Sequence, residues 1–129
     1  MKDKIIHREL GYKVVGTIFD VYNKLGPGHK EKYYERALIV ALDESGLKYR
    51  NQVPYLLKYE EHVVGRYFLD FLIEDKLVLE IKRSQRFTRQ HFNQVAEYLK
   101  VAGLELAILA TFTSDGVKTR RVLNIINHS

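Results

Sequence analysis

The sequence predicts an α/β (α+β) domain with a mixed central β-sheet flanked by helices, because the apolar residues change period along the chain. They first recur at three- and four-residue steps, as on one face of a helix. They then alternate as in strands, and helical spacing returns later in the chain. The expected order is α-α-β-β-β-α-β-β, in a single domain that covers residues 1–129.

Two amphipathic helices are expected in the N-terminal part of the chain. The first covers residues 5–25, and Gly26-Pro27-Gly28 ends it. The second covers residues 30–45, approximately, with Gly46 as its C-terminal cap. Both predictions rest on apolar spacing together with glycine at the helix end.

The later elements are predicted from alternation, turn residues and a second helical stretch. Strands are expected at residues 52–59, 63–73, 77–82 and 104–112, a helix at 89–102, and a last strand or short helix at 117–126. The polar turn around Glu60-Glu61 joins the first two strands. The apolar run at 104–112 is typical of a central strand that is buried on both faces.

Composition limits the classes of function that the chain can have. The absence of cysteine excludes disulfides, a thiolate nucleophile and a cysteine zinc site. The N-terminus is charged and the longest apolar runs are too short to cross a bilayer, so we expect a cytoplasmic protein with no membrane partner. The net charge is +5 and the pI is about 9.4, which favours polyanions. The basic residues form two clusters: Lys82, Arg83, Arg86 and Arg89, and Lys118, Arg120 and Arg121.

The hairpin at residues 66–82 carries the most informative pattern. If Glu74-Asp75-Lys76 forms a three-residue turn, Ile73 faces Leu77 and Asp70 faces Glu80. Phe68 then faces Lys82. One face of the hairpin would be apolar, with Leu69, Phe71, Ile73, Leu77, Leu79 and Ile81. The other face would carry Phe68, Asp70, Leu72, Val78, Glu80 and Lys82.

Two opposed carboxylates in a partly buried position require a cation. Their Cβ atoms would lie roughly 5 Å apart, and Lys82 alone compensates for only part of the charge. A divalent ion held by Asp70, Glu80 and a strand carbonyl would compensate better. Two alternatives remain open: a surface ion pair between Glu80 and Lys82, or a two-residue turn that moves Asp70 away from Glu80.

Two further pairs of residues have the spacing of a shared helix face. Gln94 and Tyr98 follow the basic residues of the first cluster, and Glu31 and Tyr34 lie near the start of the second helix with Glu35 beside them. Each pair also has a purely structural interpretation. A glutamate in a first turn interacts well with the helix dipole, and a tyrosine at helical spacing is usually part of the core.

Taken together, these pieces resemble a known family of nucleases. Asp70 followed by nine residues and Glu80-Ile81-Lys82 resembles the motif of the PD-(D/E)XK superfamily, with Leu69 where its name has proline. The spacing of Gln94 and Tyr98 is similar to the Gln-x-x-x-Tyr motif of its RecB-like and Cas4-like branches. The segment Gly28-His29-Lys30-Glu31-Lys32-Tyr33-Tyr34 matches the signature of the small GxxExxY proteins.

The resemblance implies a restriction-endonuclease-like core and a set of residue roles. Asp70, Glu80, the Ile81 carbonyl and Glu31 would bind Mg²⁺ or Mn²⁺, and Lys82 would act on the attacking water. Glu35 is a substitute for Glu31, and His29 stands where the GxxExxY proteins usually have an apolar residue. Residues that would contact nucleic acid or support the site are Gln94, Tyr98, Tyr34, Arg83, Arg86, Arg89 and His91.

The sequence therefore predicts a metal-dependent nuclease that cleaves phosphodiester bonds, with DNA as its expected substrate. The alternative is a non-catalytic nucleic-acid-binding or assembly module that keeps the fold, because 129 residues leave little surface beyond the core. A homodimer is compatible with either function. No Gly-x-x-x-x-Gly-Lys loop is present, so we expect no nucleotide cofactor.

Overall fold

A computed structural model describes residues 5–124 and has the predicted order of elements. The elements are α1 (Arg8–Leu25), α2 (Glu31–Ser45), β1 (Tyr49–Tyr59), β2 (His62–Ile73), β3 (Leu77–Lys82), α3 (Arg89–Ala102), β4 (Leu106–Phe112) and β5 (Val117–Leu123). The last element is thus a strand, and positions 125–126 of its predicted range lie outside the described residues. None of the three helices has the length and apolar character that a membrane span requires.

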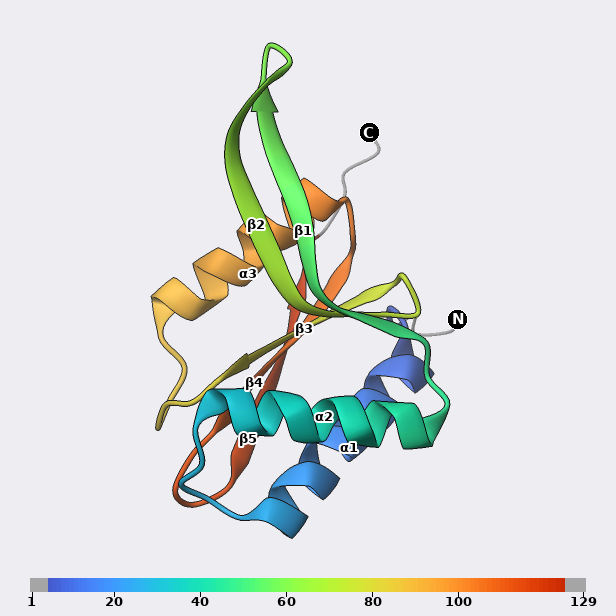
Figure 1. The fold of residues 1–129 in the computed structure, drawn as a ribbon, viewed down its shortest axis with the longest axis vertical. Helices are drawn as coiled ribbons and strands as arrows, with labels where there is room; N and C mark the ends of the chain where they lie inside the picture. Colours follow the sequence, from blue (N-terminus) through green and yellow to red (C-terminus); the bar gives the residue numbers. More distant parts are fainter. Residues whose placement is uncertain (1–4, 125–129) are drawn as a thin grey trace.

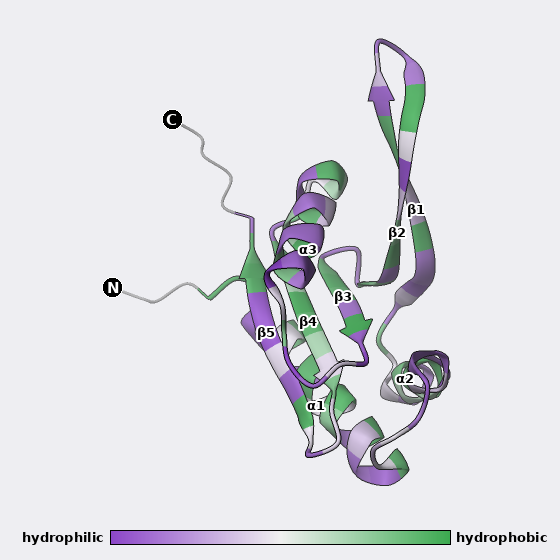
Figure 2. Cartoon of the chain, turned by 90° about the vertical axis from the view of Figure 1, so that its left-hand side faces the viewer, coloured by the Kyte–Doolittle hydropathy of each residue, from purple (hydrophilic) through white to green (hydrophobic). Residues whose placement is uncertain are grey.

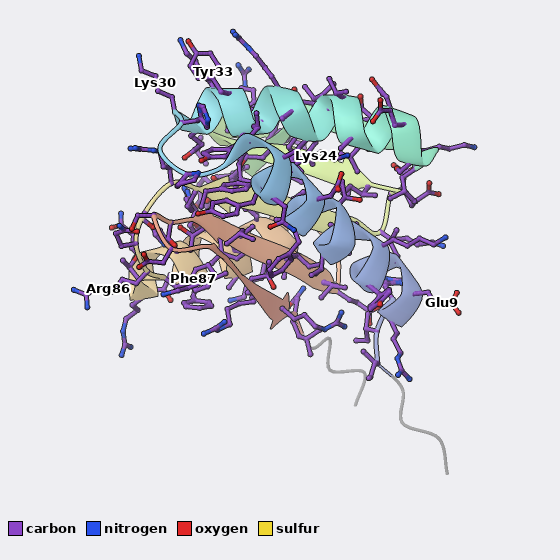
Figure 3. All side chains as sticks on the ribbon, turned by 90° about the horizontal axis from the view of Figure 1, so that it is seen from below. Glu9, Lys24, Lys30, Tyr33, Arg86 and Phe87 are labelled. Atoms are coloured by element: carbon purple, nitrogen blue, oxygen red, sulfur yellow. The ribbon has the colours of Figure 1, made fainter. Side chains whose placement is uncertain are left out.

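The strands form one mixed sheet in the order β1-β2-β3-β4-β5. β3 and β4 are parallel and are connected through α3, whereas the other neighbouring pairs are antiparallel. Figure 3 shows α1 and α2 on the same side of the sheet, and α3 packs on the opposite face. β4 is buried along its whole length between these two layers, which explains its continuous apolar sequence.

The β2–β3 hairpin has the predicted register, with Ile73 paired with Leu77 across a three-residue turn. Its predicted apolar face packs against α1 and α2 through Phe71, Ile73, Leu77, Leu79 and Ile81. The prediction that Leu69 belongs to this face is wrong, since Leu69 packs in the cluster beneath α3. The alternation of β2 is interrupted between Leu69 and Phe71, opposite Gln52 of β1, whose φ is 54°, while the register on either side is unchanged.

Tyr34 anchors the connection between α1 and α2 in the core. Its ring is buried and stacks on Phe112 with 4.1 Å between centroids. Its hydroxyl donates to the Gly26 carbonyl at 2.7 Å and accepts from the His29 N–H at 3.3 Å. The His29 ring contacts the Leu25 carbonyl at 3.0 Å, at the end of α1. Tyr34 therefore determines where α2 begins relative to the sheet.

We predict that Tyr34→Phe lowers the free energy of unfolding by about 1–2 kcal/mol, because the Gly26 carbonyl loses its buried donor while the ring still stacks. Urea denaturation measures this difference. Tyr33→Phe on the exposed side of α2 is the matched control and is expected to change stability by less than about 0.5 kcal/mol. Equal stability of the Tyr34→Phe variant and the wild type would show that this hydrogen bond does not anchor the loop.

Candidate active site

The candidate site lies where β2 and β3 separate. Their ladder ends at the pair Phe71–Leu79, and β2 then leaves the body of the sheet together with β1 (Figure 1). At the next position the Asp70 N–H donates to Glu80 Oε1 at 2.8 Å, and the Ile81 N–H donates to Asp70 Oδ2 at 2.9 Å. Each carboxylate thus accepts from the backbone of the opposite strand.

These two hydrogen bonds bring Asp70 and Glu80 together, as the hairpin register predicts. The pairing predicted for Phe68 and Lys82 does not form, because the strands have already separated at that point. The separation also removes the two carboxylates from a regular ladder. Their remaining oxygens are then available to other ligands near the gap between the strands.

Two amides from β1 support the carboxylates, and the sequence analysis assigned neither of them to the site. Gln52 Nε2 donates to Glu35 Oε2 at 2.7 Å and to Asp70 Oδ1 at 3.2 Å. Asn51 Nδ2 donates to the same Glu35 oxygen at 2.8 Å and to the Asp70 carbonyl at 2.7 Å. The signal in the sequence was two adjacent amides at the start of an apolar strand, where β propensity is low.

The surroundings of the site disfavour the ionised forms of its carboxyl groups. Burial, followed by repulsion from Asp70, raises the pKa of Glu80 from 4.5 to about 9. Burial also raises the pKa of Asp70, although the Ile81 N–H opposes this effect. Loss of solvent and the charge of Asp70 raise the pKa of Glu31, and Lys82 opposes them. Three acidic groups therefore lie within electrostatic reach of one another.

Lys82 and α3 form the other wall of the site. Lys82 Nζ donates to Gln94 Oε1 at 2.8 Å, so Gln94 holds the lysine head group. Tyr98 lies one turn further along α3, nearly buried, with its ring edge-on to Tyr67 at 5.5 Å. Burial and then the charge of Glu80 raise the pKa of Tyr98 to about 12, which keeps its hydroxyl protonated.

Several predicted residues lie in other surroundings. Tyr34 and His29 are absorbed in the α1–α2 connection, and neither belongs to the carboxylate cluster. His91 closes a capping box on α3: its Nδ1 accepts from the Thr88 N–H at 3.3 Å, and its own N–H donates to Thr88 Oγ1. Burial, followed by the charge of Lys82, lowers the pKa of His91.

The two basic clusters also differ in their surroundings. Arg83 and Arg86 are exposed on the connection from β3 to α3, and Arg89 is exposed at the first position of α3. Arg120, in contrast, lies over the Phe87 ring at 5.2 Å, and Lys118 Nζ donates to the Gln85 carbonyl. Arg120 and Lys118 therefore support the connection that follows β3. Figure 3 shows the Arg86 side chain pointing away from the body of the protein.

The donor chemistry fits a hard divalent cation. Within residues 5–124 no three histidine or acidic side chains stand together as a complete metal site. Asp70 and Glu80 nevertheless offer oxygen ligands, Glu80 from a buried position and Asp70 from a half-buried one. Burial disfavours the ionised form of Glu80, and a bound cation would favour it. Two carboxylates with backbone and water oxygens would complete the coordination that Mg²⁺ prefers.

The raised pKa of Glu80 predicts an unusual pH dependence for the metal-free protein. Between pH 4.5 and about 9 the folded state keeps a proton on Glu80 that the unfolded state has released. Stability is therefore fully present below this window and falls as the pH rises through it. Glu80→Gln is expected to be more stable than the wild type near pH 8 and to have a shallower slope, measured by urea denaturation in EDTA.

Glu44→Gln, an exposed carboxylate on α2, is the control for the loss of one negative charge. The slope that remains in the Glu80→Gln variant reports Asp70 and Glu31, whose pKa values shift in the same direction. If the wild type and Glu80→Gln have parallel stability curves, Glu80 is not protonated in the folded protein.

Comparisons with known proteins give the same fold. The chain is similar to the protein in the crystal structure of SSO0001, with a TM-score of 0.60 and 21% identity over 74% of this chain and 50% of that one. It therefore spans half the length of SSO0001. It is also similar to an alkaline exonuclease from Laribacter hongkongensis, with a TM-score of 0.51 and 10% identity over 84% of this chain and 76% of that one.

At these identities the two structures show the fold alone. No curated protein matches the chain significantly. The family model described as "PD-(D/E)XK nuclease superfamily" matches residues 8–122, a region that contains all of the site residues described above. The chain therefore belongs to the PD-(D/E)XK nuclease superfamily.

Proposed function

We propose that this protein is a metal-dependent nuclease that hydrolyses phosphodiester bonds, with DNA as its substrate. The proposal rests on the two hydrogen bonds by which the Asp70 and Glu80 carboxylates each accept from the backbone of the opposite strand. Gln94 holds Lys82 beside them. The arrangement combines two oxygen ligands, a deficit of positive charge and a positioned ammonium group. Metal-assisted phosphodiester hydrolysis can use each of these features.

We assign the residues that would hold Mg²⁺ or Mn²⁺ as Asp70, Glu80, the Ile81 carbonyl and Glu31. When bound, such an ion supplies a lower pKa for water and neutralises charge on the phosphate. Glu31 joins the set because its carboxylate interacts with both Asp70 and Lys82. Glu35 instead receives two amide hydrogen bonds from β1, and these favour a role in positioning Asp70.

Lys82 would orient the attacking water or stabilise the charge that develops on the phosphate. Its ammonium group keeps two further donor hydrogens after the bond to Gln94, and one of them can serve the substrate. Tyr98, beneath the cluster, keeps a neutral hydroxyl close to the carboxylates. We propose that it supports the site without taking a proton.

The exposed basic residues Arg83, Arg86 and Arg89 would contact the phosphate backbone. They follow Lys82 directly in sequence, so a strand bound to them passes the carboxylates. His91 would approach the same strand from the first turn of α3. Within the superfamily, we place the chain with the GxxExxY proteins, on the strength of the segment from Gly28 to Tyr34.

Cleavage of DNA with Mg²⁺ or Mn²⁺ is the first test of this function. Asp70→Asn and Glu80→Gln keep an acceptor oxygen for the backbone amides and remove a charge from the metal ligands. Both are expected to lose metal binding in calorimetric titrations and to lower the cleavage rate by about 100-fold or more. Lys82→Ala is expected to keep metal binding and to lose cleavage.

Asp43→Asn on the far end of α2 is the control and is expected to keep both properties. Metal binding without cleavage in the wild type, together with salt-sensitive DNA binding, would select the non-catalytic nucleic-acid-binding module instead. If the wild type binds neither Mg²⁺ nor Mn²⁺, with or without DNA, the catalytic function is wrong.

The phosphate-binding role of the basic connection predicts a change in salt dependence. Arg83→Gln with Arg86→Gln removes two exposed cations, and the slope of log K against log salt is expected to fall in magnitude by about 2. Lys48→Gln with Lys76→Gln removes two exposed cations near the β2–β3 turn and is the matched control. Fluorescence anisotropy with labelled DNA measures both slopes, and equal slopes would contradict this assignment.

A further inference from the structure

The β1–β2 hairpin forms an arm that lacks a third strand. β2 pairs with β3 only from Phe71 to Ile73, so residues 53–59 and 62–69 form a two-stranded ribbon. Figure 1 shows this ribbon extending beyond the rest of the molecule, and Figure 2 shows hydrophobic segments along it. Large apolar side chains that are exposed on the arm are Leu56, Leu57, Tyr59, Val63, Val64 and Phe68.

The structure of the arm is typical of a surface that binds a partner. A two-stranded ribbon alone is marginally stable in water, and a concentration of exposed apolar groups usually marks an interaction surface. Near its tip, Tyr59 and Val64 are 65% and 60% exposed. None of the six apolar side chains is needed to form the turn itself.

The tip carries two carboxylates whose position is costly for the backbone. Glu60 and Glu61 form the two-residue turn with φ angles of 47° and 71°, where asparagine and glycine fit best. The β2–β3 turn has a similar pair, Glu74 and Asp75, with φ angles of 54° and 55°. Glutamate at such positions stores strain, which points to a role for the side chain.

The two turns differ in what holds their carboxylates. Glu74 accepts from the Lys48 N–H at 2.7 Å, and Asp75 pairs with Arg50 at 3.2 Å. Glu60 and Glu61 have no hydrogen bond or ion pair to any residue between 5 and 124. The acidic pair at the tip of the arm is therefore exposed to solvent and accessible to a second molecule.

A groove on α1 has the complementary properties. It encloses about 700 Å³ and is lined by Ile5, Arg8, Glu9, Gly11, Tyr12, Lys13, Val15 and Arg121. The charged residues of the lining are three cations and one carboxylate, Glu9, so the groove is basic on balance. Arg121 donates to the Ile6 carbonyl at 2.6 Å, whereas the side chains of Arg8 and Lys13 form no ion pair within the described part of the chain.

We propose that the arm of one copy of this chain docks in the α1 groove of a second copy. Tyr59, beside the acidic turn, enters the apolar floor, and Glu60 and Glu61 pair with Arg8 and Lys13. The groove lies at β5 and the arm at the opposite edge of the sheet, so an arm does not reach its own groove. Nucleic acid is a poor occupant of the arm, because phosphates repel the acidic tip.

Each copy has one arm and one groove, so a two-fold dimer in which the two copies exchange arms would fill both grooves. This assembly does not depend on the proposed nuclease activity. The proposed dimer accounts for the apolar arm, its strained acidic turn and the basic groove together.

The experiment exchanges the charges of the two surfaces. Glu60→Lys with Glu61→Lys places cations on the arm, and Arg8→Glu with Lys13→Glu places carboxylates on the groove. Each variant alone then brings like charges together, and its dimer dissociation constant is expected to rise by about tenfold or more. In an equimolar mixture both contacts again join opposite charges, so the dimer is expected to return.

Sedimentation equilibrium measures the mass of each sample and of the wild type, and circular dichroism verifies folding. A wild type that stays monomeric at all concentrations overturns the proposal. An oligomer that both reversals leave intact, or a mixture that stays monomeric, overturns it as well.

Discussion

The separation of β2 from β3 at Asp70 is the constraint on which the site depends. Ending a ladder inside a sheet leaves backbone N–H groups without partners, and this is costly when water is excluded. Here the Asp70 and Glu80 side chains accept from the amides of the opposite strand. The same two residues thus end the ladder, satisfy the amides and present oxygens in the opening.

The segment from Gly28 to Tyr34 contributes one residue to the core and another to the site. Tyr34 is buried and fixes the α1–α2 connection through the Gly26 carbonyl. Glu31, three residues earlier, faces the charges of Asp70 and Lys82. Because both belong to the first turn of α2, the anchoring of one sets the position of the other. A motif that suggests a single functional face therefore combines a structural and an electrostatic residue.

The sequence predicted the order of the elements and the hairpin register, because both follow from periodicity and turn length. It did not predict the positions of Asn51 and Gln52, since their role comes from a distortion in β1 that no period records. The alternation of β2 is interrupted opposite the same point, which puts Leu69 on the other face of the sheet. Local sequence patterns predict regular strands well, but they do not predict a site that forms where a strand is irregular.

The site and the arm have a common structural cause. β2 leaves the sheet at Asp70, and the part of the hairpin beyond that point forms the arm. The base of the arm carries Asn51 and Gln52, whose amides hold both Asp70 and Glu35. A rotation of the arm therefore moves the donors that orient these carboxylates.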